Sequence, residues 1–209
     1  DEIESGKPLP WARALAISVQ VARGIQHAHD RRVIHRVIKP GNILVRESGD
    51  VAVSDFGLAR ASTSATHIRS GSIAGTPDYM APEQFLGKSA PDIRSDIYSL
   101  GVMMYEMLSG DTPFKGNFPT LFRMHTEDEV PPFPSELKID ADISDIVFKC
   151  LEKDPDDRYQ DVDEVLTALS DLTGKPVSTV KAAGLGPTPG EPATPEEEED
   201  IPVSYTHLR

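Results

Sequence analysis

Residues 35–42 read His-Arg-Val-Ile-Lys-Pro-Gly-Asn, and Asp55-Phe56-Gly57 begins thirteen positions after Asn42. Between these segments, the apolar runs 42–46 and 51–54 are separated by Ser48-Gly49-Asp50, a combination of residue types that is typical of a tight turn. The sequence therefore predicts a β-hairpin with one polar segment before it and another after it.

A long helix is predicted before this stretch, from about Pro10 to His29. Pro10 suits the first turn of a helix, because its missing N–H would have no partner there. Val33 to His35 is predicted to form a short strand, and Trp11 is predicted to lie in the core. The apolar residues of the helix recur every three or four positions: Ala14, Ile17, Val21, Ile25 and Ala28.

The second half of the chain is predicted to be helical, with three apolar stripes at helical spacing. Ser95 or Asp96 is expected to cap the first of these helices, and Gly110 to end it. Residues 61–75 are small and polar and are expected to form a surface loop. The stripes are Ile97, Leu100, Met104 and Leu108; Ile143, Ile146, Val147, Cys150 and Leu151; and Val162, Val165, Leu166, Leu169 and Leu172.

The fold class that follows is α+β, mainly α-helical, with short β-hairpins. A length of 209 residues suits one domain with a sizeable core.

Beyond about Gly174 the composition changes to Pro, Gly, Thr and Glu, which cannot bury enough apolar surface to offset the entropy of ordering. Residues 174–202 are therefore predicted to be a disordered acidic, Pro-rich linker. Residues 203–209 resemble the translated end of a sequencing-library adapter and are predicted to be an artefact outside the fold.

The formal net charge is −13. An acidic surface argues against binding to nucleic acid or to an anionic membrane, because both need a basic face. No apolar run approaches the length of a membrane-spanning helix, and the single cysteine, Cys150, cannot form an internal disulfide. We therefore expect a reduced, cytoplasmic protein without a nucleic-acid partner; a parent protein anchored in a membrane downstream of the linker is compatible with this.

The polar segments 35–42 and 55–57 resemble the catalytic loop and the metal-binding loop of a serine/threonine protein kinase. Three further segments follow in the order of that family. Residues 75–83, Gly-Thr-Pro-Asp-Tyr-Met-Ala-Pro-Glu, resemble the loop that docks the substrate and closes the activation segment. Residues 95–101 resemble the start of the central buried helix, and residues 154–158 resemble a late segment whose Arg pairs with the Glu of the Ala-Pro-Glu triplet. The resemblance spans roughly Gly6 to Leu172 and is strongest to the eukaryotic-like kinases of bacteria.

The resemblance implies phosphoryl transfer from ATP to Ser or Thr of a protein substrate. Asn42 and Asp55 would be ligands of Mg²⁺, and Lys39 would lie beside the transferred phosphate. The family has an Asp as the third residue of the loop, where it accepts the proton of the substrate hydroxyl, and this sequence has Val37. Loss of a positioned base costs roughly 10²–10⁴-fold in rate, so the chain is predicted to be inactive as written.

Four other matched residues are expected to be structural. His35 would pack and hydrogen-bond the catalytic loop, and Asp96 would steady its backbone. Glu83 and Arg158 would form a buried ion pair, which is costly to break from one side.

The activation segment carries the remaining predictions. Arg36 would meet a phosphorylated loop, because a phosphate pairs well with a guanidinium. Ser70 and Ser72 are the candidate phosphosites, and a plain polar loop is the alternative for each. Thr76 would dock the substrate, although it would lack its usual partner opposite Val37.

The chain shows no counterpart of the Gly-rich loop, strand Lys and hinge of the small lobe. Residues 1–173 would therefore be a partial kinase domain, the large C-terminal lobe with the small lobe absent, and would bind ATP weakly or not at all.

Two hypotheses remain for Val37. The parent is an active kinase and Val37 is a variant or an error in the sequence, or the parent is a pseudokinase that acts as a binding or scaffold module. Decay at Asn42 or Asp55 would favour the second, and both residues are intact.

Overall fold

The computed structural model describes residues 7–46, 48–56, 77–87, 90–173 and 205–207. The expected loop 61–75, the linker 174–202 and the candidates Ser70, Ser72 and Thr76 lie outside the described residues. The elements in chain order are α1 (Trp11–His29), η1 (Pro40–Asn42), β1 (Ile43–Arg46), β2 (Val51–Val53), η3 (Pro77–Tyr79), α3 (Pro82–Leu86), α4 (Ile93–Ser109), α5 (Phe118–Thr126), η4 (Ser135–Leu137), α6 (Ala141–Cys150), η5 (Pro155–Asp157), α7 (Val162–Thr173) and β3 (Tyr205–His207).

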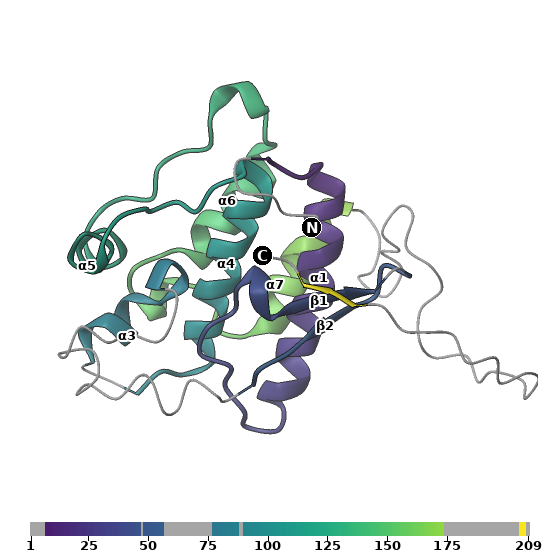
Figure 1. Ribbon diagram of the computed structural model, residues 1–209, viewed down its shortest axis with the longest axis horizontal. Coiled ribbons are helices and arrows are strands. Elements are labelled where there is room, and N and C mark those ends of the chain that lie inside the picture. The colour runs from purple at the N-terminus through teal and green to yellow at the C-terminus, as the bar shows by residue number, and fades with distance from the viewer. Residues whose placement is uncertain (1–6, 47, 57–76, 88–89, 174–204, 208–209) are drawn as a thin grey trace, which may run out of the picture.

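Helix α4 lies at the centre of a helical layer that α1, α6 and α7 complete (Figure 1). Its residues are apolar or small around most of the circumference, so burial on every side favours it. Gly101 allows the close approach of α6, because a Cβ at this position would lie only 2.7 Å from Cβ of Cys150. The three predicted apolar stripes are confirmed as the buried faces of α4, α6 and α7, with Leu172 at the edge of the core.

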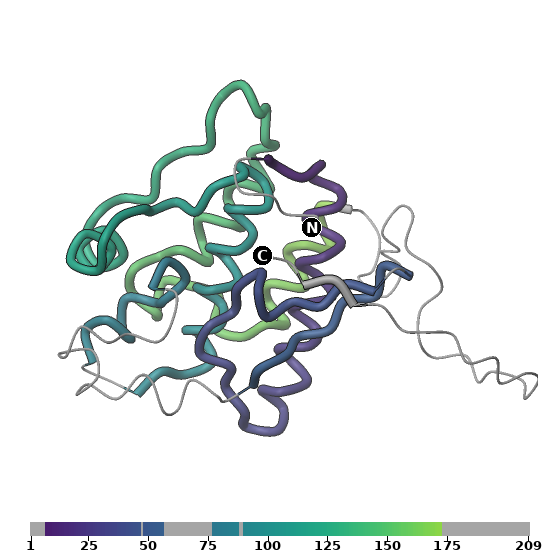
Figure 2. The backbone as a smooth tube through the Cα atoms, in the orientation of Figure 1, coloured from purple at the N-terminus to yellow at the C-terminus, as the bar shows by residue number. Residues whose placement is uncertain are grey.

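The predicted hairpin is confirmed and lies across α1. Strands β1 and β2 pair antiparallel with Ile43 opposite Val53 and Val45 opposite Val51. Figure 2 shows the chain leaving the end of α1 in a wide bend and returning as this hairpin. The path places the segment before β1 beside the segment after β2, which is where the candidate site lies.

The last strand, β3, pairs antiparallel with the free edge of β1, with Val45 opposite Thr206. Of the segment 203–209, which the sequence argument left out of the fold, the structure describes residues 205–207, and their backbone extends the sheet in the order β2-β1-β3. Tyr and Thr have high β propensity, and an open strand edge offers unpaired N–H and C=O groups to any such segment. The origin of residues 203–209 stays a prediction.

Three local predictions were wrong. Residues 33–35 form no strand, because the N–H of Val33 donates to Ala28 O at 2.9 Å and closes a turn at the end of α1. Asp92, rather than Ser95 or Asp96, caps α4 by accepting from the N–H of Arg94 at 2.8 Å. Trp11 is 56% exposed instead of buried. Gly110 does end α4, in the left-handed conformation with φ 87°.

A second apolar cluster joins α3, α5 and the loop after α4. It contains Met80, Phe85, Phe114 and Leu121, and the ring of His125 lies among its aromatic side chains. This cluster fixes the segment 77–86 against the helical layer. In the described part of the chain, no helix is both long and apolar enough to cross a membrane.

Candidate active site

The carboxylate of Asp96 holds the backbone at the start of the catalytic-loop segment. It accepts hydrogen bonds from the N–H of His35 at 2.9 Å and the N–H of Arg36 at 2.6 Å. A third contact, 2.8 Å long, joins Asp96 Oδ2 to Nε2 of His29 at the end of α1. Asp96 is fully buried, so α4 positions this loop from inside the core. The contact with His29 was not expected from the sequence.

The ring of His35 links the segments on either side of the hairpin. Its Nε2 lies 2.8 Å from the carbonyl oxygen of Ser54, which can only accept, so Nε2 carries the proton. The same ring meets Phe56 edge to face, with 4.7 Å between the ring centroids. His35 therefore packs and hydrogen-bonds, and it ties residues 35–36 to residues 54–56.

Asn42 and Asp55 lie at the open end of the hairpin: Asn42 directly precedes β1, and Asp55 is two residues beyond the end of β2. The N–H of Ser54 donates to Asn42 O at 2.8 Å, which continues the strand pairing to the residue before Asp55. The amide nitrogen of Asn42 donates to Val37 O at 3.2 Å, so the amide oxygen points away from that contact. Asp55 is exposed, and Ser54 Oγ donates to its Oδ2 at 3.3 Å. An amide oxygen directly before β1 and a carboxylate shortly after β2 are the kinds of ligand that Mg²⁺ accepts, and Mg²⁺ takes few protein ligands.

Two residues of the site adopt left-handed backbone conformations that non-glycine residues rarely take. Arg36 has φ 81° and Asp55 has φ 63°. Such conformations cost about 1–3 kcal/mol each and persist where the surroundings over-determine them, often at functional sites. Here the bond from Arg36 N–H to Asp96 and the bond from Ser54 to Asp55 supply that restraint.

Val37 is the loop residue at which the sequence leads us to expect that a catalytic base is missing. Its side chain is half-buried and packs against the main core cluster, so the aliphatic group has an apolar environment. Lys39 is half-buried two residues further on, directly before η1. The loop keeps its geometry through backbone and amide contacts that do not require a carboxylate at position 37.

Gln84 connects this loop to the segment 77–86. This contact was not predicted from the sequence. Gln84 Nε2 donates to Arg36 O at 2.9 Å, and Gln84 Oε1 accepts from the N–H of Ala81 at 2.8 Å. The sequence did carry a signal, because a Gln at the third position of a helix that starts with Pro82 commonly reaches back to the N-terminal backbone. One buried amide therefore joins the catalytic loop to the start of α3.

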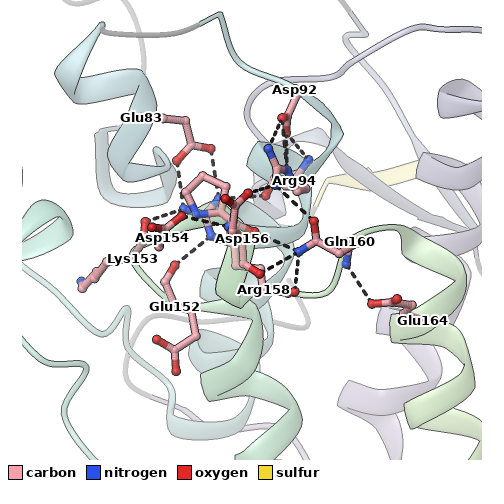
Figure 3. A network of polar contacts seen from close by, with 11 residues as sticks. Glu83, Asp92, Arg94, Glu152, Lys153, Asp154, Asp156, Arg158, Gln160 and Glu164 are labelled. Carbon is pink, nitrogen blue, oxygen red and sulfur yellow. Dashed lines mark hydrogen bonds and ion pairs between the residues drawn. The ribbon is translucent and has the colours of Figure 1, made fainter.

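Arg158 and Glu83 form the buried pair expected from the sequence (Figure 3). Two parallel hydrogen bonds join them, and Arg158 also donates to the carbonyl oxygens of Glu152 and Lys153 at 2.7 and 3.0 Å. Ser95 Oγ donates to Glu83 Oε1 at 2.6 Å. Burial opposes ionisation of Glu83, but the hydrogen bonds and charge of Arg158 outweigh it and lower the pKa of this carboxyl. The pair anchors α3 to the segment before α7.

Tyr79 and Glu106 form a second polar contact in the same segment. The Tyr79 hydroxyl donates to Glu106 Oε2 at 2.5 Å, and Tyr79 O accepts from Ser99 Oγ at 2.7 Å. Burial, together with the charges of Asp78 and Asp111, raises the pKa of Glu106. Burial first, and then Glu106, raises the pKa of Tyr79 far above its usual range. This contact fixes residues 77–80 on α4.

His125 of α5 is buried behind that segment. Its Nδ1 lies 2.8 Å from the Tyr98 hydroxyl, and its ring stacks on Phe85 with 5.3 Å between centroids. Burial, and then the charge of Lys153, lowers the pKa of His125 to about 3. The ring is therefore neutral at physiological pH and serves as part of the aromatic cluster.

The structure thus brings most of the predicted site residues into one region and leaves the others undescribed. His35, Arg36, Val37, Lys39, Asn42 and Asp55 surround the open end of the hairpin. Glu83, Asp96 and Arg158 support that region from the helical layer. Within the described ranges, no group of three or more His, Cys, Asp or Glu side chains gathers as a metal site.

Comparison with known proteins agrees with this arrangement. The family described as protein kinase domain matches residues 1–168. A probable serine/threonine-protein kinase of Clostridium perfringens is 38% identical over 184 residues, covering 87% of this chain and 27% of the relative. A probable serine/threonine-protein kinase of Streptomyces coelicolor is 35% identical and covers 94% of this chain and 30% of the relative.

Serine/threonine-protein kinase PknB of Mycobacterium leprae is 36% identical over 172 residues, covering 81% of this chain and 28% of that protein. The chain therefore spans less than a third of the length of these relatives. The ordered motifs, the helical layer that supports them and these similarities together lead to one conclusion: the chain belongs to the protein kinase family, as a serine/threonine kinase domain of the eukaryotic-like bacterial type.

Proposed function

We propose that this chain is the large-lobe part of a bacterial kinase that phosphorylates Ser or Thr of proteins, and that Val37 makes it inactive as written. The observation that carries the proposal is the site around the hairpin. The sequence retains Lys39, Asn42 and Asp55 there, while the side chain two residues before Lys39 is aliphatic and packs on the core.

Each residue has a role that its chemistry allows. Asn42 and Asp55 offer the hard oxygen ligands that hold Mg²⁺ when ATP is bound, and Mg²⁺ supplies charge neutralisation for the phosphates. Lys39 adds a positive charge beside them. Val37 can neither orient the substrate hydroxyl nor take its proton, because it has no lone pair. ATP binding in this proposal needs a small lobe that closes over the hairpin.

A pseudokinase is the second candidate, and one observation favours it. The valine side chain is compatible with its surroundings, because it packs against apolar neighbours. Asp96 and Gln84 hold the loop through the backbone of Arg36, so the loop does not depend on the side chain at position 37. In that case the intact protein would bind a partner or a nucleotide and transfer no phosphate.

The decisive experiment uses the intact two-lobed protein from the source organism. We expect Val37→Asp to raise the rate of phosphoryl transfer to a protein substrate by about 10²-fold or more, because the positioned base returns. Val37→Asn is the matched control: its amide can orient a hydroxyl but cannot accept the proton, so it should stay near the valine form. Equal rates for the Val and Asp forms would contradict the proposal.

Two further measurements separate the candidates. Sequencing codon 37 in the source genome distinguishes a genuine valine from an error. Calorimetric titration with Mg²⁺ and ATP then tests the valine protein. Binding without transfer, and no gain from Val37→Asp, would favour the pseudokinase.

A further inference from the structure

An apolar groove lies at the end of the helical layer opposite the catalytic loop. It has a volume of about 570 Å³ and receives apolar side chains from the segment before α1, from α4, from α6 and the residues before it, and from α7, namely Leu9, Leu108, Ile139, Ile143 and Leu172. Figure 1 shows the start of α1 and the end of α7 at this same end of the molecule. The groove lies at the start of α1, whereas β2, which leads into the candidate active site, packs beside Gly24, thirteen residues and roughly 20 Å further along the helix.

The rim of the groove carries an exposed aromatic residue. Trp11 lines the groove and is 56% exposed, although tryptophan is costly to leave in water. Large exposed aromatic groups beside apolar hollows are typical of interaction surfaces, because a flat ring buries much area at a small entropic cost. The expectation that Trp11 belongs to the core failed here, and the exposed ring needs another explanation.

The charges on the rim indicate what the groove would accept. Asp140 and Asp142, at the start of α6, and Lys138 line it, so carboxylates outnumber the one cation. Both Asp side chains are exposed. A ligand with apolar side chains between basic residues would match this surface.

We propose that the groove binds residues 175–181 of the same chain, Lys-Pro-Val-Ser-Thr-Val-Lys. Val177 and Val180 are the apolar contacts of this segment, and Lys175 and Lys181 flank them as partners for Asp140 and Asp142. The remainder of the linker, with its acidic run 196–200, lacks such a combination. The segment is thus the part of the linker whose chemistry fits the groove.

Chain connectivity supports the same occupant. Leu172 lines the groove, and α7 ends one residue later at Thr173. Val177 is four residues after Thr173, and four extended residues span at most about 14 Å, so Val177 can lie no further than this from the end of α7. Because the segment is tethered beside its site, its effective concentration is in the millimolar range, and a weak contact suffices. The linker would then leave the domain on the face remote from the active site, whatever the activity at Val37.

The single tryptophan of the chain makes the proposal directly measurable. We expect acrylamide to quench Trp11 fluorescence roughly twofold more strongly in full-length Val177→Ser/Val180→Ser than in the unaltered chain, because a seated segment covers much of the exposed ring. The double variant Leu185→Ser/Ile201→Ser removes the same kind of side chain elsewhere in the linker and should behave like the unaltered chain. Equal quenching in all three proteins would overturn the proposal.

Charge variants and a peptide complete the test. Asp142→Lys should increase quenching, and Asp145→Lys, an exposed residue of the same helix outside the groove, should not. A synthetic peptide of residues 174–182 should restore protection to Val177→Ser/Val180→Ser at millimolar concentration. Failure of the peptide, or an equal effect of Asp145→Lys, would overturn the proposal. Protection that rises with protein concentration would also overturn it, because the occupant would then be a second copy of the chain.

Discussion

Arg158 and Glu83 are 75 positions apart in the sequence and meet through two parallel hydrogen bonds, Nη1 to Oε1 at 3.0 Å and Nη2 to Oε2 at 2.9 Å. The Arg158 side chain is completely buried and that of Glu83 is 10% exposed. Two charges removed from water in this way stabilise each other only as a pair. The contact therefore couples α3 to the segment before α7.

Removing one partner of this pair should be far worse than removing both. We expect Arg158→Met to lower the free energy of unfolding by about 3–5 kcal/mol, because it leaves a buried carboxylate unpaired. Arg158→Met/Glu83→Gln should recover a large part of that loss. Urea denaturation of Arg158→Met, of Glu83→Gln and of the double variant gives the coupling energy between the two side chains. Additivity within about 0.5 kcal/mol would show that the pair does not act as a unit.

The same carboxyl should produce acid sensitivity. The pKa of Glu83 is lowered in the folded state from a usual value of 4.5. Its ionised form therefore contributes stability that is complete above pH 4.5 and is lost as the pH falls through the lower folded value. Glu83→Gln should have a flatter stability profile than the unaltered chain below pH 4.5. Identical slopes in that range would exclude this role.

His125 should act in a different pH range. Its pKa is about 3 in the folded protein against 6.5 in the unfolded chain, so acid protonates the unfolded state first. The stability that depends on the neutral ring is present above pH 6.5 and falls by up to about 1.4 kcal/mol per pH unit below it.

His125→Gln should lose less stability than the unaltered chain between pH 6.5 and pH 5, as measured by urea denaturation. A comparison of the two proteins at pH 8, where the ring is neutral in both states, gives the packing cost of the substitution alone. If both proteins have the same slope below pH 6.5, the buried ring is not the group that titrates.

The contact between Tyr79 and Glu106 should respond in opposite ways to two substitutions. Tyr79→Phe removes the donor and leaves a half-buried carboxylate, at a cost of about 1–3 kcal/mol. Glu106→Gln keeps an acceptor for the hydroxyl and removes a charge near Asp78 and Asp111. The raised pKa of Glu106 means that ionisation of this carboxyl costs the folded state stability as the pH rises above the unfolded value of 4.5, so Glu106→Gln should gain stability relative to the unaltered chain as the pH rises above 4.5. A relative loss over that range would contradict the assignment.

Asp96 should be the most sensitive support of the catalytic loop. Asp96→Asn leaves one side-chain oxygen to accept from three donors, those of His29, His35 and Arg36, and places an amide N–H against one of them. The free energy of unfolding should fall by about 3 kcal/mol. Hydrogen exchange at the amides of His35 and Arg36 should rise together with the loss of stability. Asp92→Asn on the same helix is the matched control, because Asn caps a helix about as well as Asp and should cost well under 1 kcal/mol in capping. Similar losses for both variants would mean that Asp96 is an ordinary helix-terminal residue.

The family and the position of the site could be predicted from local sequence. The segment 35–42, the hairpin and Asp55 are close in the chain, so their chemistry and their proximity follow from order and turn residues alone. The amphipathic stripes of α1, α6 and α7 were equally clear, because burial of one helix face imposes a period near 3.6. The expectation that Val37 replaces a catalytic base likewise rests on the order of residues alone.

Tertiary structure decided the contacts between segments that are distant in the chain. The cap of α4 was predicted at Ser95 or Asp96, but Asp96 is drawn into the core by three donors from the catalytic loop and α1, so Asp92 takes the cap. Gln84 on Arg36, His29 on Asp96 and the exposed ring of Trp11 have no periodic signal. A side chain's partner depends on which elements pack beside it, and only the folded chain brings those elements together.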